Sequence, residues 1–214
     1  MKESLIDLSE PAARGFNGQS KRKALVASIL DALDIHVCVE TGTYRGATTA
    51  WLALHGQTVF TVELNEENRV DLERMFSDID EVSLHFGDSR RFLKELSAEP
   101  RCPQQGVCFY LDAHWNQDLP LREEVRMVAT GWRRSVIMID DFEVPNDSGY
   151  YFDSYAGVGT LTRTFLEGQG MPRFHWFWPS TPSRNEDGAC RGCAVLAWED
   201  DVAEILARLP TLHT

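Results

Sequence analysis

The sequence lacks long apolar runs, both within the chain and at its N-terminus. No window approaches the roughly 18 consecutive apolar residues that a membrane-spanning helix needs, and no signal-peptide pattern precedes the first helix. With 214 residues, 43% of them hydrophobic and 25% charged, the chain can bury one sizeable core. We therefore expect one domain over residues 1–214, located in the cytoplasm and without a membrane partner.

Basic residues and cysteines are also few. The 21 lysines and arginines face 33 acidic residues, and the resulting net charge of −12 disfavours binding to the phosphates of nucleic acids. Five cysteines are present, and this odd number is typical of reduced thiols rather than a disulfide framework. Cys190 and Cys193 have C-x-x-C spacing but no second ligand pair, so neither zinc binding nor redox chemistry is indicated.

Apolar segments alternate with helical ones through most of the chain. This alternation predicts an α/β fold, with a Rossmann-like, open, mostly parallel sheet and helices on both faces. Strands are expected at 37–40, 58–63, 82–86, 107–112 and 136–140. Helices are expected between them at 47–54, 66–76, 90–96 and 121–129.

The two ends of the chain have different patterns. Residues 1–16 predict an arm, and a helix over 20–33 follows it, so that the arm and this helix occupy 1–35. Near the C-terminus, two apolar segments at 174–178 and 193–198 flank a stretch rich in proline, serine and aspartate. That arrangement predicts a C-terminal antiparallel hairpin with a long loop.

The turn after the first predicted strand carries the most informative pattern, E-x-G-x-x-x-G at Glu40, Gly42 and Gly46. Gly42 permits a sharp turn with positive φ, and Gly46 permits close approach of a ligand. Glu63 ends the next strand about 20 residues later, where a carboxylate binds ribose hydroxyls in such folds. Because the third glycine of G-x-G-x-x-G is missing, the pattern predicts an adenosine ligand without a pyrophosphate.

With these residues, segment 37–139 resembles the class I S-adenosylmethionine-dependent methyltransferases. The resemblance implies that the first turn meets the methionine end of the cofactor and that Glu63 holds the ribose. It also implies adenine contacts at Asp88 and Ser89, in the run Phe86-Gly87-Asp88-Ser89 after the third strand. The cofactor-binding residues implied in this way are Glu40, Gly42, Thr43, Tyr44, Gly46, Glu63, Asp88, Ser89 and Asp112.

Three aspartates and one histidine follow the fourth and fifth predicted strands. Asp112 and His114 follow the fourth strand, and Asp140 and Asp141 end the fifth. The carboxyl ends of parallel strands line one crevice, so these side chains are expected to converge. Three carboxylates repel one another unless a cation compensates them, and Mg²⁺ prefers carboxylate oxygens. The alternative is that these aspartates are helix caps and solvated loop acids.

Asp112 with Asp140 and Asp141 resembles the metal-dependent sugar and natural-product O-methyltransferases related to macrocin O-methyltransferase. The resemblance implies that these three aspartates hold Mg²⁺, which would acidify a substrate hydroxyl. His114 stands where a general base is expected, with an ordinary pKa of about 6.5, and Asp112 is the other candidate proton acceptor. A packed, hydrogen-bonded histidine is the alternative interpretation of His114.

The sequence therefore predicts an S-adenosylmethionine-dependent O-methyltransferase that acts on a hydroxyl of a small molecule or sugar, assisted by a divalent metal. Two alternatives stay open: a nicotinamide-dependent oxidoreductase, which would need pyrophosphate recognition, and a non-catalytic cofactor-binding module. The aromatic segment 150–155 is predicted to form a wall or lid of the acceptor pocket, with an ordinary surface loop as the alternative. The sequence is also compatible with a homo-oligomer.

Overall fold

The computed structural model describes residues 7–114 and 118–214, and its centre is an eight-stranded sheet. The strands follow the order β10-β8-β9-β5-β4-β1-β2-β3. Five of them form the parallel part and match the predicted bounds to within one residue: β1 (Val37–Thr41), β2 (Thr58–Glu63), β3 (Val82–Phe86), β4 (Val107–Leu111) and β5 (Val136–Asp140). The predicted open, mostly parallel sheet is confirmed.

The C-terminal hairpin is also confirmed, and it belongs to the same sheet. It consists of β8 (His175–Pro179) and β9 (Cys193–Ala197), and β9 pairs antiparallel with β5. Two features were not predicted. A short edge strand, β10 (Leu212–His213), pairs with β8, and a separate small hairpin joins β6 (Ser154–Tyr155) to β7 (Gly159–Thr160).

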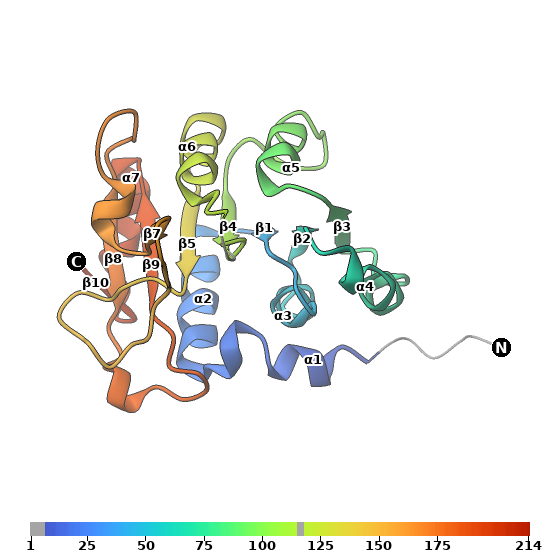
Figure 1. Cartoon of the computed structure of the whole chain (residues 1–214), viewed down its shortest axis with the longest axis horizontal. Helices are drawn as coiled ribbons and strands as arrows, with labels where there is room; N and C mark the ends of the chain where they lie inside the picture. The colour runs from blue at the N-terminus through green and yellow to red at the C-terminus, as the bar shows by residue number, and fades with distance from the viewer. Residues whose placement is uncertain (1–6, 115–117) are drawn as a thin grey trace.

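Helices cover both faces of the sheet, as predicted (Figure 1). The face below the sheet in Figure 1 is covered by α1 (Ser9–Ala13), α2 (Ser20–Leu33), α3 (Ala47–Leu54) and α4 (Arg69–Phe76). The opposite face is covered by α5 (Ser89–Leu96) and α6 (Leu121–Gly131). The last helix, α7 (Asp200–Leu206), packs with α2. In the described part of the chain, no helix has both the length and the apolar character that crossing a membrane requires.

The apolar residues of the central strands explain why helices cover both faces of the sheet. In β4, Val107, Phe109 and Leu111 pack on the side of α5 and α6, whereas Cys108 and Tyr110 pack on the opposite side. All five side chains are buried. Because successive residues of a strand point to opposite faces, an almost continuously apolar strand is stable only between two layers of helices.

Two local predictions need correction. The predicted N-terminal arm contains the helix α1, which packs against α3, while its residues 1–6 lie outside the described ranges. The predicted helix 66–76 is divided into a 3₁₀ helix (Glu66–Asn68) and α4. The side chain of Asn65 accepts a hydrogen bond from the Glu67 amide (2.9 Å), which caps the 3₁₀ turn.

Candidate active site

The strand order reverses between β1 and β4, because the chain builds β1, β2 and β3 in one direction and then crosses to β4. In open α/β sheets, a crevice forms at the carboxyl ends of the strands on either side of such a reversal. Gly42 follows β1 with a φ of 88°, and a Cβ there would lie 2.3 Å from the carbonyl oxygen of Asp112, which follows β4. Only glycine fits this turn.

Packing also explains the second glycine of the pattern. Gly46 precedes α3 with a φ of 74°, and a Cβ there would lie 2.8 Å from the Phe76 ring of α4. Packing against α4 therefore already requires a glycine at this position, apart from any ligand. The amides of Gly42 and Thr43 both donate to the carbonyl of Val62 (3.0 and 3.1 Å), which fixes the turn to β2.

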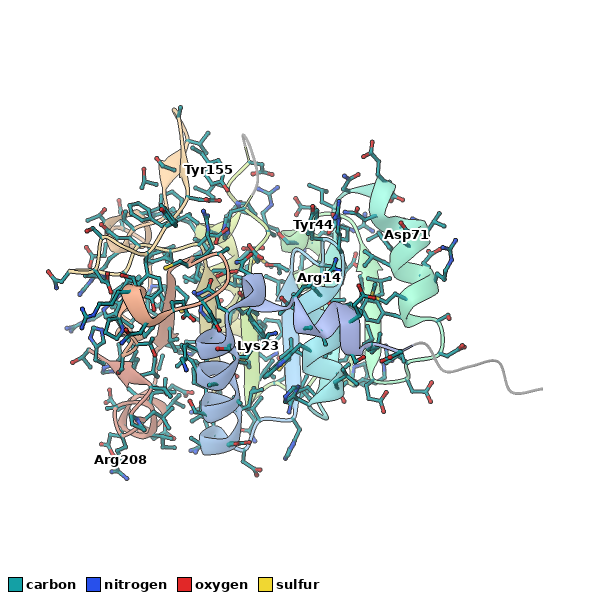
Figure 2. The ribbon with its side chains drawn as sticks, turned by 90° about the horizontal axis from the view of Figure 1, so that it is seen from below. Arg14, Lys23, Tyr44, Asp71, Tyr155 and Arg208 are labelled. Atoms are coloured by element: carbon teal, nitrogen blue, oxygen red, sulfur yellow. The ribbon has the colours of Figure 1, made fainter. Side chains whose placement is uncertain are left out.

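Glu63 joins this turn to the end of β2. Its Oε2 accepts from the Tyr44 amide (2.5 Å) and its Oε1 from the Asn65 amide (2.7 Å). Since a carboxylate offers about four acceptor positions, each oxygen keeps one for a ligand hydroxyl. The Tyr44 side chain is 61% exposed beside it. Figure 2 shows Tyr44 and Tyr155 at the same edge of the molecule, opposite Arg208.

Glu40, near the end of β1, is buried and bonded within the protein. Its Oε2 accepts hydrogen bonds from the hydroxyls of Thr49 in α3 and of Thr61 in β2, the latter at 2.6 Å. Burial raises the pKa of Glu40 to about 7. The hydroxyls of Thr61 and Thr43 are 2.6 Å apart, so these side chains link the turn to its two neighbouring strands.

Asp88 caps α5 by accepting from the amides of Arg90 (2.9 Å) and Arg91 (3.2 Å). Its carboxylate also pairs with the Arg90 guanidinium, and this hydrogen bonding keeps the pKa of Asp88 below its usual range. Arg90 also pairs with Asp118 (2.7 Å) and Glu123 (3.1 Å). Among the residues predicted to meet the adenine, Ser89 is buried beside this cap.

At the neighbouring strand ends, the structure brings Asp112, His114 and Asp141 together. Ligand atoms of these three side chains all lie within 4.8 Å of one another. His114 Nε2 is 3.6 Å from Asp112 Oδ1, too far for a hydrogen bond. The imidazole is almost fully buried, and neither of its nitrogens has a hydrogen-bond partner among the described residues.

The third predicted metal ligand, Asp140, lies apart from this group and faces α2. Arg22 Nη1 is 2.5 Å from Asp140 Oδ1, and both side chains are 1% exposed. Asn17 Nδ2 donates to Asp140 Oδ2 at 2.9 Å. Each oxygen of Asp140 is thus bonded to a side chain from the N-terminal segment, and Asp140 is not among the three residues whose ligand atoms lie close together.

Asp141 is held by Arg191, which precedes β9. Arg191 Nε donates to Asp141 Oδ1 (2.5 Å), and Nη2 pairs with Asp153. The hydroxyl of Tyr155 in β6 donates to Asp153 Oδ2 (2.6 Å) and lies 2.8 Å from the His114 carbonyl. Arg22 and Arg191 therefore compensate part of the negative charge for which the sequence predicted a metal ion.

The N-terminal segment and the 187–191 loop are bonded to each other behind this group. Gln19 pairs with the backbone of Arg191 in both directions, at 2.9 and 3.2 Å, and Arg22 Nη2 donates to the Arg191 carbonyl at 2.6 Å. The amide of Ser20 donates to Asp187 at 2.6 Å. These bonds fix the backbone from which the Arg191 side chain extends.

Burial is the main cause of the pKa shifts of Asp112, His114 and Asp141. Burial, with the charges of Asp140 and Asp141, raises the pKa of Asp112 well above its usual range. Burial raises the pKa of Asp141 to about 6 and lowers the pKa of His114 to about 4. At neutral pH the imidazole is therefore uncharged, which is the form that can accept a proton or bind a metal ion.

The sequence did not predict the contacts made by Asn17, Arg22, Asp153 and Arg191. One signal for Arg22 exists: it lies three residues before Leu25, on the apolar face of the predicted helix, where a charged residue needs a buried partner. The predicted lid segment is anchored in this structure. Tyr150 is buried and donates to the Thr181 carbonyl (2.8 Å), whereas Tyr151 and Phe152 are exposed.

Solved structures to which this chain is similar include methyltransferases. A candidate O-methyltransferase from Klebsiella pneumoniae is 18% identical with a TM-score of 0.58, covering 93% of this chain and 91% of that one. An O-methyltransferase from Bacillus cereus in complex with S-adenosylhomocysteine is 15% identical, with a TM-score of 0.56 and 92% of both chains covered.

A third structure, CalS10 from Micromonospora echinaspora, is an amino pentose methyltransferase of calicheamicin biosynthesis with bound S-adenosylmethionine. It is 14% identical with a TM-score of 0.53, covering 93% of this chain and 100% of that one. No protein-family model and no curated protein matches the sequence. The chain therefore has the fold of class I S-adenosylmethionine-dependent methyltransferases.

Proposed function

We propose that the protein is an S-adenosylmethionine-dependent O-methyltransferase that acts on a hydroxyl of a small molecule or sugar with the help of a divalent metal ion. One observation carries the proposal: the glycine turn after β1 contacts the backbone of Asp112, and the side chain of Asp112 belongs to the acid and imidazole group. A cofactor site and a hydroxyl-activating site therefore adjoin at one residue.

On the cofactor side, the residues fit an adenosine ligand without a pyrophosphate. The turn at Gly42 to Gly46 would face the methionine end, and Glu63 would accept hydrogen bonds from both ribose hydroxyls with its remaining lone pairs. Asp88 and Ser89 would border the adenine. Since the Asp88 side chain is bonded to Arg90, we expect Asp88 to contribute to cofactor binding through the shape and charge of the α5 N-cap.

On the acceptor side, the donor set fits a divalent cation. Asp112 and Asp141 supply carboxylate oxygens beside a buried imidazole that has no partner of its own among the described residues. Asp140, predicted as the third carboxylate ligand, would act from behind through its ion pair with Arg22. When bound, a divalent ion supplies Lewis acidity, which lowers the pKa of a coordinated hydroxyl.

The remaining work of the chain is orientation and proton removal. Arg191 holds Asp141 in place, and Tyr155 ties the β6–β7 hairpin to the backbone of His114. In-line attack on a methyl group depends mainly on such positioning, which can contribute several kcal/mol. Asp112 and His114 are the candidate groups that would receive the proton of the acceptor hydroxyl.

Two measurements test this function. Calorimetry with S-adenosylhomocysteine and, in parallel, with NAD tests the cofactor class. Transfer of a labelled methyl group from S-adenosylmethionine to a panel of sugars and vicinal diols, with Mg²⁺, Mn²⁺ or EDTA, tests the reaction. We expect S-adenosylhomocysteine to bind, NAD not to bind, and EDTA to abolish transfer.

Each outcome has a clear meaning. Binding of NAD without S-adenosylhomocysteine would favour the oxidoreductase alternative. Binding of S-adenosylhomocysteine without transfer to any acceptor would favour the non-catalytic module. Full transfer in EDTA would remove the metal from the proposal and leave the aspartates as caps and ion-pair partners.

A further inference from the structure

We infer that the metal site is formed by Asp112, His114 and Asp141, a mixed nitrogen and oxygen site that selects a transition metal ion such as Zn²⁺, Fe²⁺ or Co²⁺ over Mg²⁺. This inference deepens the proposed function, because it names the ion class and ligand set at the same site. Its test is direct metal binding, which requires neither cofactor nor methyl transfer.

The distances agree with three ligands around one ion. Metal–ligand bonds of about 2.0–2.1 Å place adjacent ligand atoms about 3 Å apart and opposite ones about 4.2 Å apart. The three side chains have ligand atoms within 4.8 Å of one another, and the pair from His114 and Asp112 is 3.6 Å apart. Shifts of a few tenths of an ångström up to about 1 Å would bring them into coordination.

The buried imidazole of His114 also indicates that a ligand binds here. The His114 side chain is 1% exposed, yet both ring nitrogens lack a hydrogen-bond partner among the described residues. A buried polar group without a partner costs about 1–3 kcal/mol, so a ligand is expected at this position. The Asp112 and Asp141 side chains are 34% and 18% exposed, which gives an ion a route from solvent.

Asp140 is not one of the proposed ligands. Arg22 and Asn17 bond its two oxygens, one each, and the ion pair with Arg22 is buried. A cation already compensates this carboxylate, so it has little need of a second one. Arg191, by contrast, bonds Oδ1 of Asp141, and no described residue donates a hydrogen bond to its Oδ2; residues that orient a metal ligand commonly bond it in this way.

Ligand chemistry then sets the choice of ion. Sites made only of carboxylates, carbonyls and water suit Mg²⁺ and Ca²⁺, whereas imidazole suits zinc, iron, nickel and copper. Because the proposed ligand set contains His114 where an all-carboxylate site would have a third aspartate, the site favours zinc, iron and related transition metal ions. His114 would then be a metal ligand rather than a general base, and the ion would supply the Lewis acidity that lowers the pKa of the acceptor hydroxyl.

The test is titration of the metal-free protein with Co²⁺, Zn²⁺ and Mg²⁺ by calorimetry, with spin-echo spectroscopy of bound Mn²⁺ to detect imidazole nitrogen. We expect Co²⁺ and Zn²⁺ to bind far more tightly than Mg²⁺, and Mn²⁺ to show nitrogen coupling. His114→Ala should weaken Co²⁺ binding by more than the roughly 10–100-fold typical for loss of a residue that only orients a ligand. His114→Asp should abolish the nitrogen coupling and narrow the gap between Co²⁺ and Mg²⁺.

The matched control is His36→Ala, at an exposed histidine before the amino end of β1, and it should change Co²⁺ affinity no more than a few-fold. Asp140→Asn leaves Arg22 buried without its charged partner, so its readout is the nitrogen coupling of bound Mn²⁺, which should persist. Circular dichroism checks that each variant is folded. Absence of nitrogen coupling in the wild-type protein overturns the inference without any variant. Loss of metal binding in folded Asp140→Asn but not in His114→Ala would restore the all-aspartate set. Either result leaves S-adenosylmethionine binding, and with it the proposed function, to be judged separately.

Discussion

Arg22 of α2 and Asp140 at the end of β5 form an ion pair in which both side chains are only 1% exposed, although 118 residues separate them in the chain. Neither side chain can easily exchange this ion pair for another interaction. A buried charge that loses its partner remains desolvated, and neither solvent nor a nearby surface group can replace the missing bond. The ion pair thereby ties α2 to the strand end that carries the candidate active site.

Replacing Arg22 should therefore destabilise the protein strongly. We expect Arg22→Met to lower the free energy of unfolding by about 3–5 kcal/mol, because it leaves Asp140 buried and unpaired. Urea denaturation at pH 7 measures the change. Arg14→Met is the matched control, since Arg14 pairs with Glu10 on the surface, and it should cost less than about 1 kcal/mol. Equal effects of the two substitutions would contradict the role of the buried pair.

Glu63 is expected to be the residue on which cofactor affinity depends most. Glu63→Ala removes two charge-assisted hydrogen bonds to the ribose, each worth about 1.5–3 kcal/mol, and should weaken S-adenosylhomocysteine binding by about 100-fold or more. Calorimetry on the folded variant checks this. Glu67→Ala, at an exposed acid in the next turn, serves as the control and should leave the affinity unchanged. An unchanged affinity in Glu63→Ala would remove Glu63 from the cofactor site.

Glu124 in the first turn of α6 should make stability depend on pH. It is buried, its Oε1 has no partner among the described residues, and burial raises its pKa from 4.5 to about 7. Between these two values the unfolded chain has lost the proton that the folded chain keeps. The free energy of unfolding therefore falls as the pH rises through this range, by at most about 1.4 kcal/mol per pH unit from this group.

Glu124→Gln removes the ionisable group, and with it the loss of stability that this group causes as the pH rises. We expect the variant to gain stability relative to the wild-type protein as the pH is raised from 5 to 8, as measured by urea denaturation at both values. Other buried acids, such as Glu40, titrate in both proteins and cancel in the comparison. The exposed neighbour Glu123→Gln should show no such gain. A difference between variant and wild type that does not change with pH would contradict the prediction.

Tyr155 is expected to affect the acceptor more than the cofactor. Tyr155→Phe loses the bonds from its hydroxyl to Asp153 and to the His114 carbonyl, which frees the β6–β7 hairpin from the acid group. Turnover of the acceptor should fall about 10-fold, equivalent to about 1.4 kcal/mol, with little change in S-adenosylhomocysteine affinity. Tyr151→Phe, at a 65% exposed neighbour, should change neither quantity. Loss of cofactor binding in Tyr155→Phe would show that the hairpin supports the whole site instead.

The parallel sheet could be predicted from the sequence because its signal is local. Each central strand is a short apolar run that ends in an acid, and the glycines at 42 and 46 mark the turn after β1. The short elements α1 and β10 carry no such signal. They have five and two residues, and packing against α3 and pairing with β8 stabilise them rather than their own propensity.

The site could be predicted only in part, for a related reason. Strand-end position brought Asp112, His114 and Asp141 together correctly, since carboxyl ends of neighbouring parallel strands share an edge. The same rule could not separate Asp140 from Asp141, because adjacent residues on a strand end point to different sides. It also could not supply Arg22 and Arg191, whose partners are 118 and 50 residues away along the chain.

The bonds between the N-terminal segment and the 187–191 loop bear on the synthesis of this protein. Gln19 and Ser20 find their partners, Arg191 and Asp187, 172 and 167 residues later. A chain emerging from the ribosome can form the β1–α3–β2 unit early, but Arg22 and Asp140 gain their complete surroundings only after β9 has been made. A nascent chain that stops before residue 187 would therefore carry the glycine turn, but the surroundings of Asp140 and Asp141 would be incomplete. Any stabilisation of the nascent chain by bound cofactor would then come before the chain could carry out the proposed methyl transfer.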